Sequence, residues 1–132
     1  MTETPLISIV DDDDLARGGI ETLVRSLGLT ARTFASAESF LQSSSMAKTR
    51  CLILDVNMSG MSGLELQDHL SRLGSEIPII FITAYPDETI KARALSAGAI
   101  CFLHKPIDLQ GRRLVDCLHA ALDRGKGPDP VT

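Results

Sequence analysis

Four consecutive carboxylates follow an apolar stretch in the sequence LISIVDDDDLARGGI, which occupies residues 6–20. Like charges this close repel one another, and a solvated turn does not need four of them. Asp13 and Asp14 are expected at the start of a helix, where carboxylates favour the positive end of the helix dipole. Asp11 and Asp12 come directly after the apolar run and require another partner. Simple capping and solvation of a helix start is the alternative for the whole run.

Three further residues whose side chains could take part in chemistry lie at the end of other apolar runs or just after them. Asp55 follows the residues LIL, Thr83 ends the run IPIIFIT, and Lys105 ends the run AICFLHK. Each has an ordinary structural alternative, because a turn Asp, a strand-end Thr and a Lys-Pro turn are all common. The case for a site therefore depends on whether the fold brings these side chains to one place.

The apolar pattern predicts strands alternating with helices. Short runs of β-type residues occur at 6–10, 30–34, 51–56, 77–83 and 99–105, and the third and fourth are apolar at consecutive positions, as in strands covered on both faces. Segments with helical spacing occupy 15–27, 36–42, 62–74, 87–98 and 108–124, with a loop at 42–50. Ser62 and Glu65 form a capping-box pattern, Asp108 is a good N-cap, and Leu15 belongs to the apolar face of the first helix.

This alternation predicts an α/β fold with a parallel sheet between two layers of helices. At this length we expect a flavodoxin-like (βα)5 three-layer sandwich with strand order 2-1-3-4-5. Residues 5–124 would form the domain, and the Gly/Pro-rich residues 125–132 a linker or C-terminal tail.

In such a sheet, sites form beyond the carboxyl ends of the strands. Strands 1 and 3 are neighbours in the expected order, so Asp11, Asp12 and Asp55 would converge, with Thr83 and Lys105 beside them. Three carboxylates need a countercharge, and ligands that are all oxygen favour a hard cation, here Mg²⁺. Such a site would leave one Asp55 oxygen free as a nucleophile toward a phosphoryl group.

Composition narrows the function classes. The 132 residues suit one domain, and 44% are hydrophobic, enough for a substantial core. A net charge of -4 gives no general attraction to nucleic acid or anionic membranes. The N-terminus lacks a signal-peptide pattern, and no apolar run reaches membrane-spanning length. Cys51, Cys101 and Cys117 are expected to be buried, reduced thiols of a cytoplasmic protein.

Four motifs, IVDDDD, LILDVNMSGMSGLEL, IPIIFITAY and AGAICFLHKPID, resemble in order and spacing those of the receiver domain of bacterial two-component response regulators. The resemblance covers residues 5–122 and is closest to the FixJ/NarL type, whose receivers often precede a helix-turn-helix DNA-binding domain. It implies a phosphorylation-controlled switch rather than a conventional enzyme. Its expected partners are a sensor histidine kinase and a second copy of the chain after phosphorylation, with DNA contacted only through a further output domain.

The resemblance also implies roles for individual residues. Asp55 matches the phosphoacceptor, Asp11 and Asp12 the acidic pair that binds Mg²⁺, and Asn57 would add its backbone carbonyl to the metal ligands. Thr83 matches the hydroxyl that moves toward the phosphoryl group, and Lys105 the family's lysine, followed by a cis peptide bond to Pro106.

Three other positions concern switching and phosphoryl lifetime. Phe102 stands where the family has its switching aromatic ring, and would move together with Thr83 to change the face made by the fourth helix, fifth strand and fifth helix. Tyr85 and Asn57 flank the approach of water and are expected to tune the lifetime of the acyl phosphate. Ser59 replaces the family's usual proline, so we expect a more mobile loop there.

Two other functions fit parts of the pattern. An aspartate-nucleophile phosphohydrolase commonly needs a second acid two residues after the nucleophile, where this chain has Asn57. A receiver-like binding module that no longer takes phosphate would not need the complete set of Asp11, Asp12, Asp55, Thr83 and Lys105.

Overall fold

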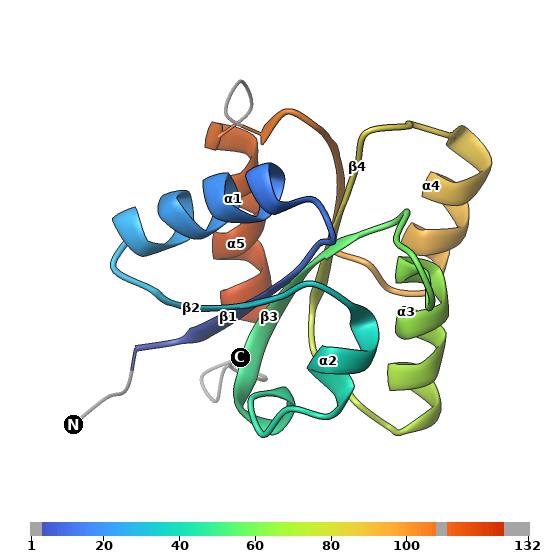
Figure 1. Cartoon of the computed structure of the whole chain (residues 1–132), viewed down its shortest axis with the longest axis horizontal. Coiled ribbons are helices and arrows are strands. Elements are labelled where there is room, and N and C mark those ends of the chain that lie inside the picture. The colour runs from blue at the N-terminus through green and yellow to red at the C-terminus, as the bar shows by residue number, and fades with distance from the viewer. Residues whose placement is uncertain (1–3, 108–110, 126–132) are drawn as a thin grey trace, which may run out of the picture.

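The computed structural model describes residues 4–107 and 111–125, which form one five-stranded parallel sheet with helices on both faces (Figure 1). The strand order is β2-β1-β3-β4-β5, so the predicted flavodoxin-like fold is confirmed. The strands are β1 (Leu6–Val10), β2 (Thr30–Phe34), β3 (Thr49–Asp55), β4 (Ile79–Thr83) and β5 (Cys101–His104). The helices are α1 (Asp14–Ser26), α2 (Ala37–Leu41), the 3₁₀ turn η1 (Met46–Lys48), α3 (Gly63–Arg72), α4 (Glu88–Ser96) and α5 (Gly111–Gly125).

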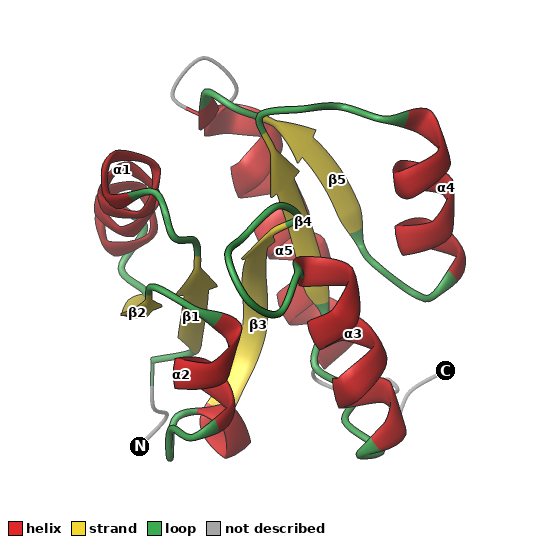
Figure 2. Cartoon of the chain, turned by 45° about the vertical axis from the view of Figure 1, so that its right-hand side comes forward, coloured by secondary structure: helices red, strands yellow, loops and turns green. Residues whose placement is uncertain are grey.

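The sheet lies between two groups of helices (Figure 2), and each of its faces carries an apolar core. Helices α1 and α5 pack on one face, where Ile20 and Leu118 meet alternate residues of the central strands. Helices α2, α3 and α4 pack on the other face, around Phe40 and Phe81. Strands β3 and β4 are buried along almost their whole length, because side chains of both orientations are covered. This explains their uninterrupted apolar sequences.

Local signals place the helix ends close to the predicted positions. The side chain of Asp13 caps α1 by accepting from the backbone N–H of Leu15. Ser62 and Glu65 form the predicted reciprocal capping box at the start of α3. Gly74 adopts a φ of +77° just after α3, a conformation that favours glycine at a helix C-terminus. The predicted N-cap Asp108, and the tail beyond residue 125, lie outside the described residues.

The structure differs from the sequence-based expectations at a few positions. Leu15 is 88% exposed rather than on the buried face of α1, because at about 3.6 residues per turn it lies on the opposite side of the helix from the buried Val24. Strand β3 begins at Thr49, whose Oγ1 hydrogen-bonds the Ser8 hydroxyl of β1 at 2.7 Å. Because Thr49 is polar, the sequence predicted a loop over residues 42–50. That loop prediction included the start of β3 and all of η1.

The prediction of three reduced thiols is wrong for two of them, since Cys101 and Cys117 form a disulfide between β5 and α5. Their Cα atoms are 6.2 Å apart, within the usual range for such a bond. The apolar pattern placed both residues on buried faces but could not show that these faces oppose each other. Cys51 is free and buried as predicted, and burial raises the pKa of its thiol to about 12.

Among the helices of the described residues, none is both long and apolar enough to span a lipid bilayer.

Candidate functional site

The predicted site residues meet at the carboxyl edge of the sheet. Asp11 follows β1 directly, Asp55 is the last residue of β3, Thr83 is the last of β4, and Lys105 follows β5. The backbone continues the sheet at these points, because the N–H of Lys105 donates to the carbonyl oxygen of Thr83 at 2.8 Å. The neighbouring pairs β1–β3, β3–β4 and β4–β5 bring the four residues together across the chain.

Lys105 forms ion pairs with two of the three carboxylates. Its Nζ lies 2.9 Å from Oδ2 of Asp11 and 3.4 Å from Oδ2 of Asp55. The Asp11 side chain is fully buried, that of Asp55 is 5% exposed and that of Lys105 is 13% exposed, so this charge cluster is largely removed from solvent. The peptide bond between Lys105 and Pro106 is cis, as the resemblance implied.

The acidic cluster has the composition and spacing of a cation site. Asp11, Asp12 and Asp55 each offer a carboxylate oxygen, and these atoms lie within 4.8 Å of one another. Oδ1 of Asp11 accepts from the backbone N–H of Asp13 at 2.9 Å. The buried Oδ2 of Asp11 has no aligned hydrogen-bond donor among the described residues, even with the Lys105 ammonium nearby. Three carboxylates whose nearest countercharge is a single ammonium fit a hard divalent cation.

The charges of the cluster shift the proton affinities of its members. Burial raises the pKa of Asp55, the charge of Asp11 raises it further, and the ammonium of Lys105 opposes both, leaving a pKa of about 7. Burial lowers the pKa of Lys105, but the neighbouring Asp11 and then Asp55 outweigh it, so the pKa lies above its usual value. The ammonium of Lys105 therefore does not fully neutralise the negative charge of the carboxylates. A second positive charge at this place would complete the neutralisation.

Thr83 is buried and lies at the centre of a small hydrogen-bond network. Its Oγ1 accepts from the side-chain amide of Asn57 at 3.3 Å and from the backbone N–H of Tyr85 at 3.0 Å. The backbone N–H of Asn57 points to Oδ1 of Asp55 at 3.4 Å. The side chain of Tyr85 is 74% exposed. Asn57 thus links the Asp55 carboxylate to the hydroxyl of Thr83.

Phe102 faces the opposite core from Cys101, its neighbour on β5. Its side chain is 6% exposed and packs against Phe81 of β4, with ring centroids 6.2 Å apart. Phe81 lies two residues before Thr83, so the ring of Phe102 and the hydroxyl of Thr83 are connected through one strand.

Sequence reasoning missed three contributors to this region. Arg17 donates to the carbonyl oxygen of Asp11 at 2.7 Å and pairs with Asp14, a contact that the i, i+3 spacing could have indicated. Ser59 and Glu38 reach the site through the loop after β3. No spacing rule connects Glu38 with that loop, because it comes from α2.

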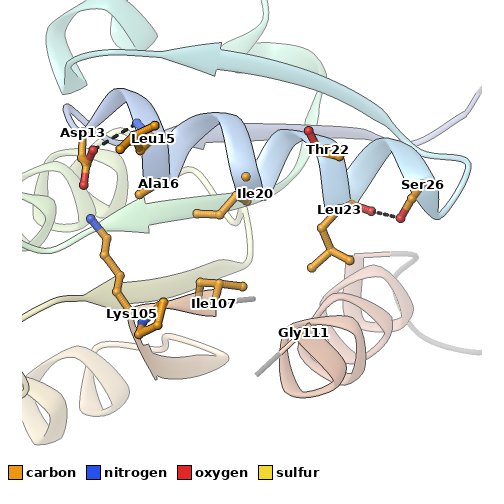
Figure 3. A pocket seen from close by; sticks show the side chains of 12 residues that line it. Asp13, Leu15, Ala16, Ile20, Thr22, Leu23, Ser26, Lys105, Ile107 and Gly111 are labelled. Carbon is orange, nitrogen blue, oxygen red and sulfur yellow. Dashed lines mark hydrogen bonds between the residues drawn. The ribbon is translucent and has the colours of Figure 1, made fainter. Parts of the chain in front are cut away.

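A cavity of about 720 Å³ lies next to the site, between α1 and the start of α5 (Figure 3). Its walls are mostly apolar, including Ala16, Ile20 and Leu23 of α1 and Ile107. Lys105 and Asp13 contribute its polar rim, whereas Asp11, Asp12 and Asp55 do not line it. The cavity is therefore a neighbour of the acidic cluster and not part of it.

Residues 7–118 match the model of the response regulator receiver domain. The chain belongs to this family. It is 41% identical over 121 residues to nodulation protein W of Bradyrhizobium diazoefficiens, covering 92% of this chain and 52% of that protein. It is 42% identical over 117 residues to the response regulator TodT of Pseudomonas putida, covering 89% and 51%.

Solved structures agree with this assignment. The response regulator StyR is 40% identical with a TM-score of 0.80, covering 94% of this chain and 62% of StyR. FixJ-N is 29% identical with a TM-score of 0.80, covering 92% of this chain and 96% of that one. The chain spans about half the length of curated relatives such as nodulation protein W and TodT. The relatives TdiR, FixJ and DctR are named as transcriptional regulatory proteins. This response regulator receiver domain thus resembles one part of longer proteins.

Proposed function

We propose that this receiver domain accepts a phosphoryl group on Asp55 and thereby acts as a two-state switch. The observation that carries the proposal is the environment of Asp55. Its carboxylate ends a buried strand, lies 3.4 Å from the Lys105 ammonium and shares a three-carboxylate cluster with Asp11 and Asp12. These fixed neighbours orient the Asp55 carboxylate, as covalent catalysis by a nucleophile requires.

The transfer balances without a further reactant. An Asp55 oxygen attacks the phosphorus of a phosphohistidine on a partner kinase, or of a small phosphodonor such as acetyl phosphate. The new O–P bond forms as the N–P or O–P bond to the donor breaks, and the bonding pair leaves with the donor group, which takes up a proton where its basicity requires. Attack needs the ionised form of Asp55, whose pKa of about 7 would fall when a cation binds beside it.

We assign the cation as Mg²⁺, because the ligands are oxygens and few protein groups bind it, leaving places for water and phosphoryl oxygens. Asp11, Asp12 and Asp55 would hold it, together with the backbone carbonyl of Asn57. When bound, Mg²⁺ supplies positive charge that stabilises the phosphoryl oxygens during transfer. Lys105 pairs with Asp55 before the reaction and with the phosphoryl group after it.

The switch would begin at Thr83. Its hydroxyl, now bonded by Asn57 and the N–H of Tyr85, would move to donate to a phosphoryl oxygen. The ring of Phe102 would shift with it and alter the face made by α4, β5 and α5. A second copy of the chain is the expected partner of that face in the phosphorylated state.

We place the domain at residues 5–124, with residues 125–132 as a linker or tail, in a cytoplasmic pathway with a sensor histidine kinase upstream. Regulation of transcription is the proposed output, because relatives such as TdiR of Thauera aromatica are named as transcriptional regulators. DNA binding would require an output domain outside this chain, since the relatives are about twice its matched length.

One experiment separates this function from its two alternatives. The protein is incubated with acetyl phosphate and Mg²⁺, and both intact mass and donor consumption are followed over time. A single added phosphoryl group that decays after the donor is removed, and is absent in Asp55→Asn, supports the switch. Steady donor turnover without a lasting adduct would support a phosphohydrolase, and no modification at all would support a phosphate-independent binding module.

A further inference from the structure

Two carboxylates from distant elements bind the backbone of the loop that follows β3 (residues 56–62, the β3–α3 loop). Oδ2 of Asp12, from the acidic loop after β1, accepts from the N–H of Ser59 at 3.1 Å. Oε2 of Glu38, from the first turn of α2, accepts from the N–H of Met61 at 3.1 Å. We expected this loop to be more mobile. In the structure, two of its backbone amides are hydrogen-bonded to these carboxylates.

Asp12 is the least restrained member of the acidic cluster. Asp11 and Asp55 are buried and paired with Lys105, whereas Asp12 is exposed. Within the described part of the chain, the Ser59 amide is the one hydrogen-bond donor to the Asp12 carboxylate. With Asp12 in this orientation, the three carboxylates come within 4.8 Å of one another. A free exposed side chain would lose rotamer entropy on binding a cation, and the amide lowers this cost in advance.

Glu38 and the β3–α3 loop fit each other closely at Gly60. A Cβ atom on Gly60 would lie 2.9 Å from Oε2 of Glu38, and Gly60 has a φ of +76°, which favours glycine. The Glu38 carboxylate therefore packs against the loop backbone at Gly60 and accepts from the next residue, Met61. These contacts hold the two residues that directly follow Ser59, whose amide reaches Asp12.

We infer that the Ser59 amide, held in place by Glu38 through Met61, orients Asp12 for the divalent cation. Ser59 and Glu38 are then positioning residues of the metal site, although neither side chain contacts the cation. The inference rests on the proposed function, since it assigns a role within the Mg²⁺ site. Hydrogen bonds that orient metal ligands commonly contribute tenfold or more to affinity, and for this exposed carboxylate we expect roughly 3- to 10-fold.

The test is a calorimetric Mg²⁺ titration of the whole chain with two matched pairs of variants. Ser59→Pro removes the amide N–H, whereas Ser59→Ala keeps it and removes the hydroxyl. Glu38→Ala removes the acceptor for the Met61 amide, whereas Glu38→Gln keeps an acceptor oxygen. We expect roughly 3- to 10-fold weaker Mg²⁺ binding for Ser59→Pro and Glu38→Ala, and binding within twofold of wild type for Ser59→Ala and Glu38→Gln.

Folding is checked by thermal unfolding and amide NMR spectra in the absence of Mg²⁺. If Ser59→Pro does not fold, the inference is tested by the Mg²⁺ affinities of Glu38→Ala and Glu38→Gln alone. Equal Mg²⁺ affinity of Glu38→Ala and Glu38→Gln, or of a folded Ser59→Pro and Ser59→Ala, overturns the inference.

Phosphorylation and Mg²⁺ binding of the wild-type protein show whether the positioning inference alone fails or the proposed function fails as well. If wild type binds Mg²⁺ and is phosphorylated while all variants bind Mg²⁺ equally, the positioning inference alone fails. If wild type does not bind Mg²⁺, the proposed metal-dependent function fails together with it.

Discussion

Lys105 and Asp55 are separated by fifty positions in the chain, yet Nζ of Lys105 lies 3.4 Å from Oδ2 of Asp55. The contact exists because β3 and β5 end on the same edge of the sheet, on either side of β4. The same ammonium lies closer to Asp11, at 2.9 Å. One positive charge is thus divided between two buried carboxylates, and it only partly opposes burial and the charge of Asp11, which raise the pKa of Asp55.

Lys105→Gln should raise the pKa of Asp55 above about 7, because the substitution removes the positive charge that opposes burial and Asp11. The expected rise is about one pH unit. It is measured from the carboxyl ¹³C shift of Asp55 in metal-free buffer. Lys48→Gln removes an equal charge from η1, just before β3 begins, and should leave this pKa unchanged. An unchanged titration in Lys105→Gln would show that Lys105 does not control the proton affinity of Asp55.

Metal-free stability should fall as pH rises from about 4 to about 7. The usual Asp pKa near 3.9 applies to the unfolded chain, and the folded value is about 7, so the folded state binds this proton more tightly. The stabilisation is complete below the unfolded pKa and is lost by the folded pKa. Asp55→Asn lacks this titration, so its advantage over wild type should grow between pH 5 and pH 8.

The expected growth in the difference of unfolding free energy is on the order of 1–3 kcal/mol, allowing for solvent screening. Urea denaturation in the presence of a chelator measures it at both pH values. Excess Mg²⁺ at pH 8 should narrow the gap, because a cation bound to the folded state stabilises wild type. A gap that is equal at both pH values contradicts the assigned environment of Asp55.

Tyr85→Ala should shorten the lifetime of the acyl phosphate by roughly two- to tenfold, since the ring flanks the expected path of water to Asp55. Asn57→Ala should also change the lifetime, because it removes the amide that holds the Thr83 hydroxyl. Both rates are followed by the decay of the phosphorylated mass after donor removal. Leu73→Ala, an exposed position after α3, serves as the control. Decay at the wild-type rate in both site variants would show that Tyr85 and Asn57 do not control the lifetime of the acyl phosphate.

Reduction of the Cys101–Cys117 disulfide should lower the free energy of unfolding by about 3 kcal/mol, as expected for a bond with a sequence separation of 16. Denaturant titrations of wild type with and without reductant give the difference. Cys117→Ser cannot form the bond, so its stability should not respond to reductant, while Cys51 stays buried in both proteins. If reductant does not change the free energy of unfolding of wild type, the result contradicts a disulfide between Cys101 and Cys117.

The positions of Asp55, Thr83 and Lys105 could be predicted because each stands at the end of a strand. Strand periodicity and the parallel-sheet topology place such residues at one edge with no knowledge of side-chain packing. Asp13 and Ser62 could be assigned as helix caps for a similar reason, since a cap depends on residues within three positions.

Contacts that depend on the angle or register between elements could not be predicted. The pairing of Cys101 with Cys117 requires the inner face of α5 to oppose the start of β5, and periodicity does not fix that alignment. Glu38 meets the β3–α3 loop through backbone amides, which carry no residue-specific signal. The exposure of Leu15, in contrast, follows from helix periodicity, because Leu15 lies on the opposite side of α1 from the buried Val24.

The most direct test of the account is to locate the phosphoryl group. After treatment with acetyl phosphate and Mg²⁺, borohydride reduction converts an aspartyl phosphate into homoserine, and peptide mass spectrometry then identifies the modified residue. If Asp55 is the phosphoacceptor, homoserine appears at position 55 in wild type and is absent in Asp55→Asn. Homoserine at another aspartate, or an Asp55→Asn protein that gains phosphate at the wild-type rate, would contradict it.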